Sequence, residues 1–597
     1  MRLTMKVNGR STALFLATML LFCIQSLTLR LIGTDHADLL YHIHALLLGG
    51  AVFATVLAFW HYSSKVLLIY EFLIFLGTSS AYAPLFYGDG IFTGIMVSEA
   101  FLFYTLTFGT ALFIARLIRR RLRVAETFLT AAFFLVAMIS CGSWIYTAVS
   151  GALPSCDVIL AIFQTHWQEA FDFLKMQRLR DAIVVSITVL FVFWLCRRLS
   201  RTIVRADVPS RPSHPAALIL GILLLGYGCA RLIPENRDYY AVNLFKMVSS
   251  SLDEFRTYQR TVEKRMARLF AAPTLNAGAG VYVLVIGESE QRGHMSAYGY
   301  GRKTTPWLDA MAEKGTALLF KNAYSCHTHT VPALTFALTE KNQYNTIELT
   351  DAFSIMDMAR AAGFETWWLS NQRRFGLWDT PVSSIGSCSY RQFWVNGNAG
   401  TGVSSQRYDQ SLVSVMPSQV GGKTLMVIHL LGSHWLYADR YPREFRCFSD
   451  GDDRLDSQYD DSVRYTDYVL QQIYEKAKDY PGFRVMLYFS DHGEVPQAGT
   501  GHDSSKFVWP MARIPFFAIF SEAFERERPD LCENLKKHRD AFWTNDLTFN
   551  VLLGLMGFDR RHDEQFDLSS PNYAMKREDL MTLHGKKRIT DDPAAKL

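Results

Sequence analysis

Charged residues are scarce in this chain, and the two signs nearly balance. Asp, Glu, Lys and Arg make up only 20% of the 597 residues, hydrophobic residues make up 49%, and the formal net charge is +5. Proteins that bind nucleic acid need a basic patch that neutralises phosphates. We find no basic stripe of this kind, no zinc-finger spacing and no pattern of aromatic residues for base stacking. The composition therefore excludes nucleic acid as a partner.

Long apolar runs are absent after residue 235 and crowded before it. Seven runs occur, and all but the last two are near or above the roughly 20 residues that a helix needs to span a bilayer. The runs are Ala13–Leu29, Leu39–Trp60, Val66–Phe86, Ile91–Ile118, Phe128–Val149, Ala182–Cys196 and Ala216–Ala230. The first run has no convincing signal-peptide cleavage site, so we interpret it as a retained helix.

Basic residues between these runs predict which side of the membrane each loop faces. Clusters lie at the N-terminus, at Arg116–Arg123 and at Arg197–Arg211. Because short loops rich in Lys and Arg stay in the cytoplasm, seven spans place all three clusters there. Five spans, the alternative, would export the third cluster. Both counts are odd, so either one places the C-terminal half outside the cytoplasm.

The chain is too long for one domain, and we expect four segments. Residues 1–235 form a transmembrane domain of five to seven helices. Residues 236–275 form an amphipathic connector helix, over Tyr239–Phe270, and a small-residue linker. Residues 276–575 form an α/β catalytic domain. Residues 576–597 form a basic tail, which we expect to be mobile because chain ends usually are.

Strands and helices alternate from residue 281 onward. Apolar runs rich in β-branched residues predict strands, and stretches such as Thr305–Lys314 and Asp460–Lys476 have helical patterns. The predicted strands are Val281–Ile286, Glu365–Leu369, Thr424–Leu430, Arg484–Phe489 and Ile514–Phe520. This alternation is typical of a layered α/β domain.

Acidic and imidazole side chains follow three of these strands. Glu288 comes at the end of the first strand, and Asp491 and His492 follow the fourth. His434 lies just beyond the third strand, and His502 lies in a later loop. Open α/β sheets place their ligands at the carboxyl ends of strands, so we expect these side chains to meet. This set of oxygen and imidazole ligands suits zinc or manganese and not a closed cysteine zinc site.

Two threonines in the segment SCHTHTVPAL, Ser325–Leu334, are candidate nucleophiles. Thr328 and Thr330 precede Pro332, which suits the first turn of a helix. A hydroxyl at a helix N-terminus lies at the positive end of the dipole, which favours an alkoxide and phosphate oxygens. A metal ion beside it would lower its pKa. We expect Thr330 to supply the hydroxyl, and a plain N-cap threonine is the structural alternative.

Six motifs, taken in order, resemble the phosphoethanolamine transferases, which are membrane enzymes of the alkaline phosphatase and sulfatase superfamily. They are VIGES, MSAYGYGRKTTP, NAYSCHTHTVP, GSH, YDDSVRYTD and SDHGE. The resemblance covers residues 281–555, and a multi-span N-terminal domain is also the layout of that family. It therefore implies a transmembrane helical bundle followed by a sulfatase-like α/β catalytic domain.

The resemblance also implies a metal site. Its zinc ligands would be Glu288, Asp491, His492 and the nucleophilic threonine. That residue is Thr330, or alternatively Thr328, because the loop before the proline is shorter than in the lipid A branch. The family implies one zinc ion or two, and Mn²⁺ is less favoured.

Four further residues match positions near the family's site. His434 and His502 match histidines that bind the phosphoryl group or a second metal. Asn371 and Gln372 follow a predicted strand, where they would line the site.

The implied reaction transfers phosphoethanolamine from phosphatidylethanolamine to a lipopolysaccharide acceptor, either a core sugar or lipid A, through a phosphothreonine intermediate. The implied protein is a monomer that crosses the inner membrane of a Gram-negative bacterium several times and places its catalytic domain in the periplasm. One alternative is glycerol-phosphate transfer, as in lipoteichoic acid synthases. Another is a non-catalytic scaffold anchored in the membrane, although no implied metal ligand is missing.

Cysteine usage departs from the lipid A branch of the family, whose members carry several disulfides in this domain. The predicted exported half contains only Cys326, Cys388, Cys447 and Cys532, with Cys156 in an earlier loop. Among these we expect Cys388 and Cys447 to pair. The low number of cysteines and the HTHTVP segment favour the branch that acts on core oligosaccharide.

Overall fold

The computed structural model describes isolated positions between residues 104 and 118, and then residues 120–150, 156, 158–160, 179–205, 240–271, 275–372, 381–396, 408–452, 454–496 and 501–595. The chain divides into two compact units. One consists of Met1–Cys156 with His166–Met247, and the other of Asp157–Thr165 with Val248–Leu597. The predicted spans before residue 87 and the last one lie outside the described residues.

Two long apolar helices belong to the first unit. They are α6, Leu122–Ser150, and α9, Leu179–Arg205. Within the described ranges these two helices are long and apolar enough to cross a membrane. They coincide with the predicted runs Phe128–Val149 and Ala182–Cys196. Apolar side chains such as Leu190 point away from the protein, as expected of a helix that faces lipid. The total of seven spans stays a prediction.

The predicted connector consists of two helices, α11, Tyr240–Arg260, and α12, Val262–Ala271. Helix α12 packs against α15, Ile355–Ala361, through a buried guanidinium. The Arg265 guanidinium lies 3.7 Å from the centre of the Tyr258 ring and 3.8 Å from Asp357 Oδ2. Because a buried charge is costly unless it is paired, this contact fixes how α12 packs against α15 within the second unit.

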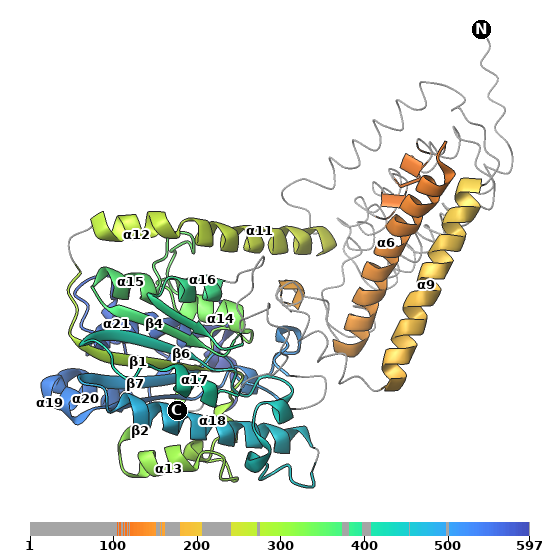
Figure 1. Ribbon diagram of the computed structural model, residues 1–597. Helices are drawn as coiled ribbons and strands as arrows, with labels where there is room; N and C mark the ends of the chain where they lie inside the picture. Colours follow the sequence, from red (N-terminus) through yellow and green to blue (C-terminus); the bar gives the residue numbers. More distant parts are fainter. Residues whose placement is uncertain are drawn as a thin grey trace. The chain divides into compact units, whose positions relative to one another are not determined.

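A seven-stranded sheet forms the centre of the second unit (Figure 1). Its order is β2-β8-β7-β1-β6-β4-β5. The strands are β1, Gly280–Gly287; β2, Ala317–Leu319; β4, Glu365–Ser370; β5, Arg391–Trp394; β6, Lys423–His429; β7, Phe483–Ser490; and β8, Phe516–Phe520. The five predicted strands are all present. From β7 to β5 the sheet is parallel, and β8 and β2 extend it with antiparallel pairs.

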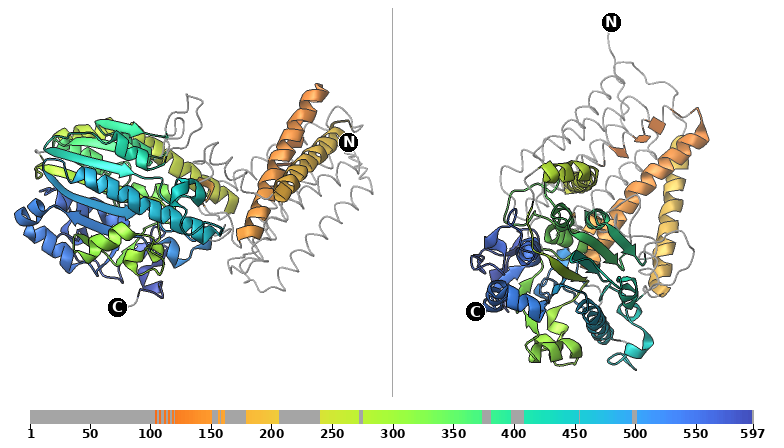
Figure 2. Two further views of the ribbon diagram at one scale, coloured as in Figure 1. Left: turned by 60° about the horizontal axis from the view of Figure 1, so that its bottom comes forward. Right: turned by 60° about the vertical axis from the view of Figure 1, so that its left-hand side comes forward.

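Helices cover both faces of this sheet, as Figures 1 and 2 show. Successive residues of β1 point to opposite faces: Tyr282, Leu284 and Ile286 enter one core, and Val281, Val283 and Val285 enter the other. The first core includes α14, Thr330–Ala337; α15; and α21, Thr548–Leu555. The second includes α13, Pro306–Glu313; α17, Gln410–Val415; and α18, Leu455–Ala477. The remaining elements are α16, Pro381–Ser387; α19, Glu522–Glu527; α20, Pro529–Lys537; β3, Asn322–Tyr324; β9, Phe542–Thr544; β10, Met581–Thr582; and β11, Lys587–Arg588.

The segment after Met575 is an ordered part of the catalytic unit, so the prediction of a mobile tail is wrong. Strands β10 and β11 form a hairpin, and Leu580 and Ile589 are buried in the first core. Asp592 accepts hydrogen bonds from Arg513 Nε at 2.8 Å and from Tyr324 Oη at 3.0 Å. The prediction was based on the charge of this segment and overlooked its apolar residues, such as Leu580 and Ile589.

The expected disulfide is not formed, because Cys388 and Cys447 are both free. Cys388 packs beside the first core, whereas the backbone N–H of Cys447 donates to Asp461 of α18, which belongs to the second core. The two cysteines therefore lie on opposite faces of the sheet. A disulfide needs Cα atoms within about 7 Å of each other.

Candidate active site

Glu288 lies directly after the central strand β1. Gly287 is the last residue of that strand, and it must be glycine because a Cβ there would lie 2.1 Å from the Tyr488 hydroxyl. Ser289 then turns the backbone, with a φ of 58°. The carboxylate of Glu288 is buried and accepts a hydrogen bond from Ser289 Oγ at 2.8 Å. This left-handed turn, which costs strain in a residue other than glycine, aims the carboxylate across the end of the sheet.

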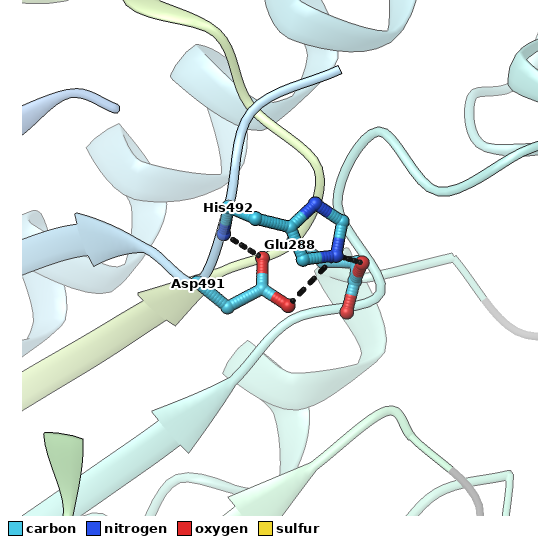
Figure 3. Close-up of side chains that lie close together, drawn as sticks. All are labelled: Glu288, Asp491 and His492. Carbon is cyan, nitrogen blue, oxygen red and sulfur yellow. Dashed lines mark hydrogen bonds and ion pairs between the residues drawn. The ribbon is translucent and has the colours of Figure 1, made fainter. Parts of the chain in front are cut away.

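Asp491 and His492 reach the same place from β7. Gly287 pairs with Ser490 in the parallel register of β1 and β7, so the two strands end side by side. The Nε2 atom of His492 lies 3.4 Å from Glu288 Oε1 and 3.3 Å from Asp491 Oδ2 (Figure 3). Ligand atoms of these three residues all lie within 4.8 Å of one another. They form the one group of this kind found in the described part of the chain.

The electrostatics of this cluster favour a bound cation. Burial and the neighbouring Asp491 carboxylate raise the pKa of Glu288 well above its usual value, and burial also raises the pKa of Asp491. Burial lowers the pKa of His492 far below its usual value, so its imidazole is neutral at pH 7. Two buried carboxyl groups beside a neutral imidazole thus lack a compensating charge. A divalent cation would provide that charge.

The hydrogen bonds of the cluster leave atoms available for a metal. Asp491 Oδ2 accepts no hydrogen bond from any group that the structure describes. The Nδ1 atom of His492 lies 2.9 Å from the carbonyl oxygen of Gly493. A proton on Nδ1 would make that bond and leave Nε2 as the metal-binding nitrogen. The residues present therefore fit a metal ion with oxygen and imidazole ligands.

Thr330 adds a hydroxyl to the same cluster. It is the first residue of α14, and Pro332 lies in the first turn, as the sequence predicts. Its Oγ1 atom lies 3.2 Å from Glu288 Oε2 and 3.3 Å from His492 Nε2. Thr328 Oγ1 instead lies 3.4 Å from His329 Nδ1. Of the two candidate nucleophiles, the geometry favours Thr330.

Two further predicted histidines lie near the cluster, His502 beside His492 and His434 beyond His502. The ring centre of His502 is 4.4 Å from that of His492 and 6.4 Å from that of His434. Glu494 Oε2 lies 2.8 Å from His502 Nδ1. Burial acts to lower the pKa of His502, but the charge of Glu494 and its hydrogen bond outweigh burial, so the net shift is upward. The site therefore places a neutral imidazole, His492, beside a second imidazole, His502, whose pKa is raised.

The predicted pair of lining residues divides into two roles. Gln372 Nε2 donates to Glu288 Oε2 and to the carbonyl oxygen of Leu430, both at 3.1 Å. Asn371 Nδ2 donates instead to Asp409 Oδ1 at 2.7 Å. Gln372 thus contacts the cluster, whereas these bonds give Asn371 a structural role.

Sequence reasoning missed His429 and Glu494. His429 ends β6 beside Ile286 of β1, where its side chain is buried and burial lowers its pKa to about 4. The predicted strand ran to Leu430, which placed His429 inside a strand and not at its end. Glu494 belongs to the motif SDHGE, and its contact with His502 spans a loop that no local pattern predicts.

The motif YDDSVRYTD lies on α18 and holds the loops around the site. Tyr459 Oη donates to the Ser289 carbonyl at 2.6 Å and accepts from the Gln291 N–H at 2.9 Å. Asp460 lies 2.7 Å from both His294 Nδ1 and Arg302 Nη1. This motif therefore fixes the turn after Glu288 and does not enter the chemistry itself.

Comparisons with known proteins match the domain that carries this cluster. Residues 281–558 match the family model described as Sulfatase. The chain is 28% identical over 424 residues to phosphoethanolamine transferase EptC of Escherichia coli O18:K1:H7, covering 64% of this chain and 72% of the relative. It is 31% identical over 269 residues to phosphoethanolamine transferase CptA of Salmonella typhimurium, covering 41% and 46%.

A solved structure resembles most of the chain. The integral membrane protein lipooligosaccharide phosphoethanolamine transferase A from Neisseria meningitidis aligns with a TM-score of 0.53 at 17% identity. The alignment covers 85% of this chain and 98% of that protein. At this identity the likeness concerns the fold alone.

The catalytic unit is a sulfatase-type α/β domain with a clustered acid–imidazole site. The chain carries a sulfatase-family domain over residues 281–558, and the relatives with which it aligns are named phosphoethanolamine transferases, as the motif order predicts. It is therefore an enzyme.

Proposed function

We propose that this enzyme transfers phosphoethanolamine from phosphatidylethanolamine to a lipopolysaccharide acceptor through Thr330. The observation that carries the proposal is the position of Thr330 Oγ1, 3.2 Å from Glu288 and 3.3 Å from His492. A hydroxyl in that position is the group expected to attack phosphorus. Its relatives are phosphoethanolamine transferases by name, which supports this reaction over glycerol-phosphate transfer.

A zinc ion is the cofactor that the residues suit best. Glu288, Asp491, His492 and Thr330 would hold it, and His434 and His502 would bind phosphoryl oxygens or a second ion. Zinc commonly takes such carboxylate and imidazole ligands, and manganese is the less favoured choice. When bound, the ion lowers the pKa of a hydroxyl and neutralises charge on the phosphoryl group.

Two displacements at phosphorus complete the reaction. Thr330 Oγ1 gives up its proton and attacks the phosphorus of the donor, the bond from phosphorus to the diacylglycerol oxygen breaks, and that oxygen leaves as an alcohol after it gains a proton. An acceptor oxygen then attacks the phosphoethanolamine on Thr330, and the threonine oxygen leaves. His502, held by Glu494 at 2.8 Å, is placed to supply and remove these protons.

The donor and acceptor classes agree with the rest of the chain. A lipid donor suits an enzyme with helices that are apolar enough to cross a membrane, since both then lie at one surface. The lipopolysaccharide acceptor is the class that the resemblance of the six motifs implies. We propose that the catalytic unit faces the periplasm of a Gram-negative bacterium from a multi-pass anchor in the inner membrane.

Intact mass measurement on the purified, zinc-loaded full chain tests the proposal. After incubation with phosphatidylethanolamine we expect a mass gain of one phosphoethanolamine, located in the peptide that contains Thr330. Thr330→Ala should abolish the adduct and lower turnover at least about 1,000-fold, as loss of a covalent nucleophile does. Thr328→Ala, the matched control, should keep both.

Other outcomes would replace the proposal. An adduct that persists in Thr330→Ala and disappears in Thr328→Ala would identify Thr328 as the nucleophile. A gain of glycerol phosphate from phosphatidylglycerol would establish the reaction of lipoteichoic acid synthases. No adduct and no release of diacylglycerol, in protein that holds zinc, would indicate a scaffold.

A further inference from the structure

Asn545 contacts both parts from which the site is assembled. It lies directly after β9, and its side chain is fully buried. Its Oδ1 atom accepts a hydrogen bond from the backbone N–H of Cys326 at 2.8 Å. Its Nδ2 atom donates to the backbone carbonyl of Asp491 at 2.8 Å and lies 3.2 Å from Ser325 Oγ. One amide thus joins the segment that leads to Thr330 with the strand end that carries two proposed metal ligands.

The local fold brings Asn545 to this position. Strands β3 and β9 are parallel, and Tyr324 pairs with Thr544. Their next residues, Ser325 and Asn545, therefore emerge side by side. Ser325 Oγ also lies 2.5 Å from the Asp491 carbonyl oxygen and 2.6 Å from the His327 carbonyl oxygen, and its one proton is shared between these two acceptors.

The position of Thr330 depends on this connection. Only three residues separate Cys326 from Thr330, and α14, which begins at Thr330, packs against the turn Asn545–Leu547. Thr330 Oγ1 lies 3.2–3.4 Å from its partners in the cluster. Displacement of a reacting group by about 1 Å can cost about 100-fold in rate.

We propose that Asn545 is a positioning residue of the transfer, which holds the Thr330 loop in register with Asp491. The inference rests on the proposed function. The Cys326 N–H needs a hydrogen-bond acceptor, and the Asp491 carbonyl and Ser325 Oγ need donors. The side-chain amide of Asn545 supplies the acceptor through Oδ1 and the donors through Nδ2. An aspartate would lose the donors and would add a buried charge, and an alanine would leave the Cys326 N–H and the Asp491 carbonyl with fewer partners.

Asn545→Ala in the zinc-loaded full chain tests the inference through three measurements. We expect adduct formation on Thr330 to slow by about 10- to 100-fold. The KM for the lipid and the affinity for zinc, measured by competition with a chelator, should stay within about threefold, because the change affects only the placement of the nucleophile.

Asn550→Ala is the matched control. Asn550 is a buried asparagine of α21, and its Oδ1 accepts from the Asp563 N–H at 2.9 Å, away from the site. This variant should lose thermal stability but form the adduct at the rate of the unchanged protein. Equal rates in Asn545→Ala and Asn550→Ala would overturn the inference.

Two other variants keep the test decisive if Asn545→Ala does not fold. Asn545→Asp keeps the acceptor for Cys326 and removes the donor to Asp491, so it should slow adduct formation. Ser325→Ala removes the second donor and should slow it less, by about 3- to 10-fold. Adduct formation at the unchanged rate in both would refute the role of Asn545. Failure of the proposed function would look different, because the unchanged protein would then form no adduct.

Discussion

The two sides of the site are built by different means. Glu288, Asp491 and His492 follow adjacent parallel strands, and the sheet places them together. Thr330 instead begins a short helix after a loop, and side chains from distant segments hold that loop. These segments are the turn at Asn545 and the hairpin after Met575, whose Thr582 Oγ1 donates to the Ser325 carbonyl at 2.7 Å.

This structural difference suggests that metal binding and placement of the nucleophile are controlled by separate parts of the site. In the proposed reaction, the residues of the strand side would hold the cation, and the loop side would position the attacking oxygen. Variants of the strand side should therefore change metal affinity, and variants of the loop side should change reaction rate at constant metal affinity. The three predictions below test that separation, from the largest expected effect to the smallest.

Glu288→Gln should lower zinc affinity by more than about 100-fold, because it removes a charged ligand and not merely a partner of a ligand. Adduct formation should fall in parallel. The metal-free variant should be about 1–2 kcal/mol more stable than the metal-free unchanged protein, since a buried carboxyl group no longer lies beside Asp491. Chelator titration and thermal unfolding measure both effects. Unchanged zinc affinity would show that the strand side does not bind the metal.

Asp592→Asn tests the loop side. Arg513 would lose its buried charge partner, and we expect a loss of about 2–3 kcal/mol in the free energy of unfolding, because the guanidinium is partly solvated. Adduct formation should slow by about 10-fold while zinc affinity stays constant. Asp591→Asn, at the exposed neighbouring position, is the control. A drop in zinc affinity equal to the drop in rate would contradict the separation.

Asp467→Asn tests a buried carboxylate that belongs to neither side. Asp467 accepts from the N–H groups of Trp307 and Leu308, and burial raises its pKa from 3.8 to about 7. The folded state then binds the proton more tightly than the unfolded state. Stability should fall as the pH rises from 3.8 to about 7, by at most about 1.4 kcal/mol per pH unit.

Urea unfolding at several pH values measures this dependence. Asp467→Asn should flatten it, and Asp456→Asn, a half-exposed carboxylate of the same helix, should not. Adduct formation should remain unchanged in both variants. A pH dependence that persists in Asp467→Asn would assign it to another group.

The sequence predicts the strand side well because its signals are local. An apolar run followed by Gly-Glu, and another followed by Asp-His, indicate where two strands end, and parallel pairing brings the ends together. Local signals of the same kind predict the five strands. They also place Gln372, directly after a predicted strand, near the site, where it contacts Glu288. His429 was missed because the end of its strand was placed one residue too late.

The loop side depends on contacts that no local pattern contains. Asn545 meets Cys326 across 219 residues, and Thr582 meets Ser325 across 257. Nothing in the sequence near Asn545 or Thr582 indicates these partners. The prediction of a Cys388–Cys447 disulfide was wrong for a related reason. Spacing along the chain does not reveal on which face of a sheet a residue lies.

The order of the segments along the chain has a consequence for biosynthesis. A ribosome has made all three strand-end ligands once it passes His492, yet Asn545 and the hairpin that hold the Thr330 loop emerge later. A nascent chain thus contains the three residues of the strand side before the segments that hold the Thr330 loop. If the proposed function holds, we expect transferase activity to develop only when the domain is nearly complete.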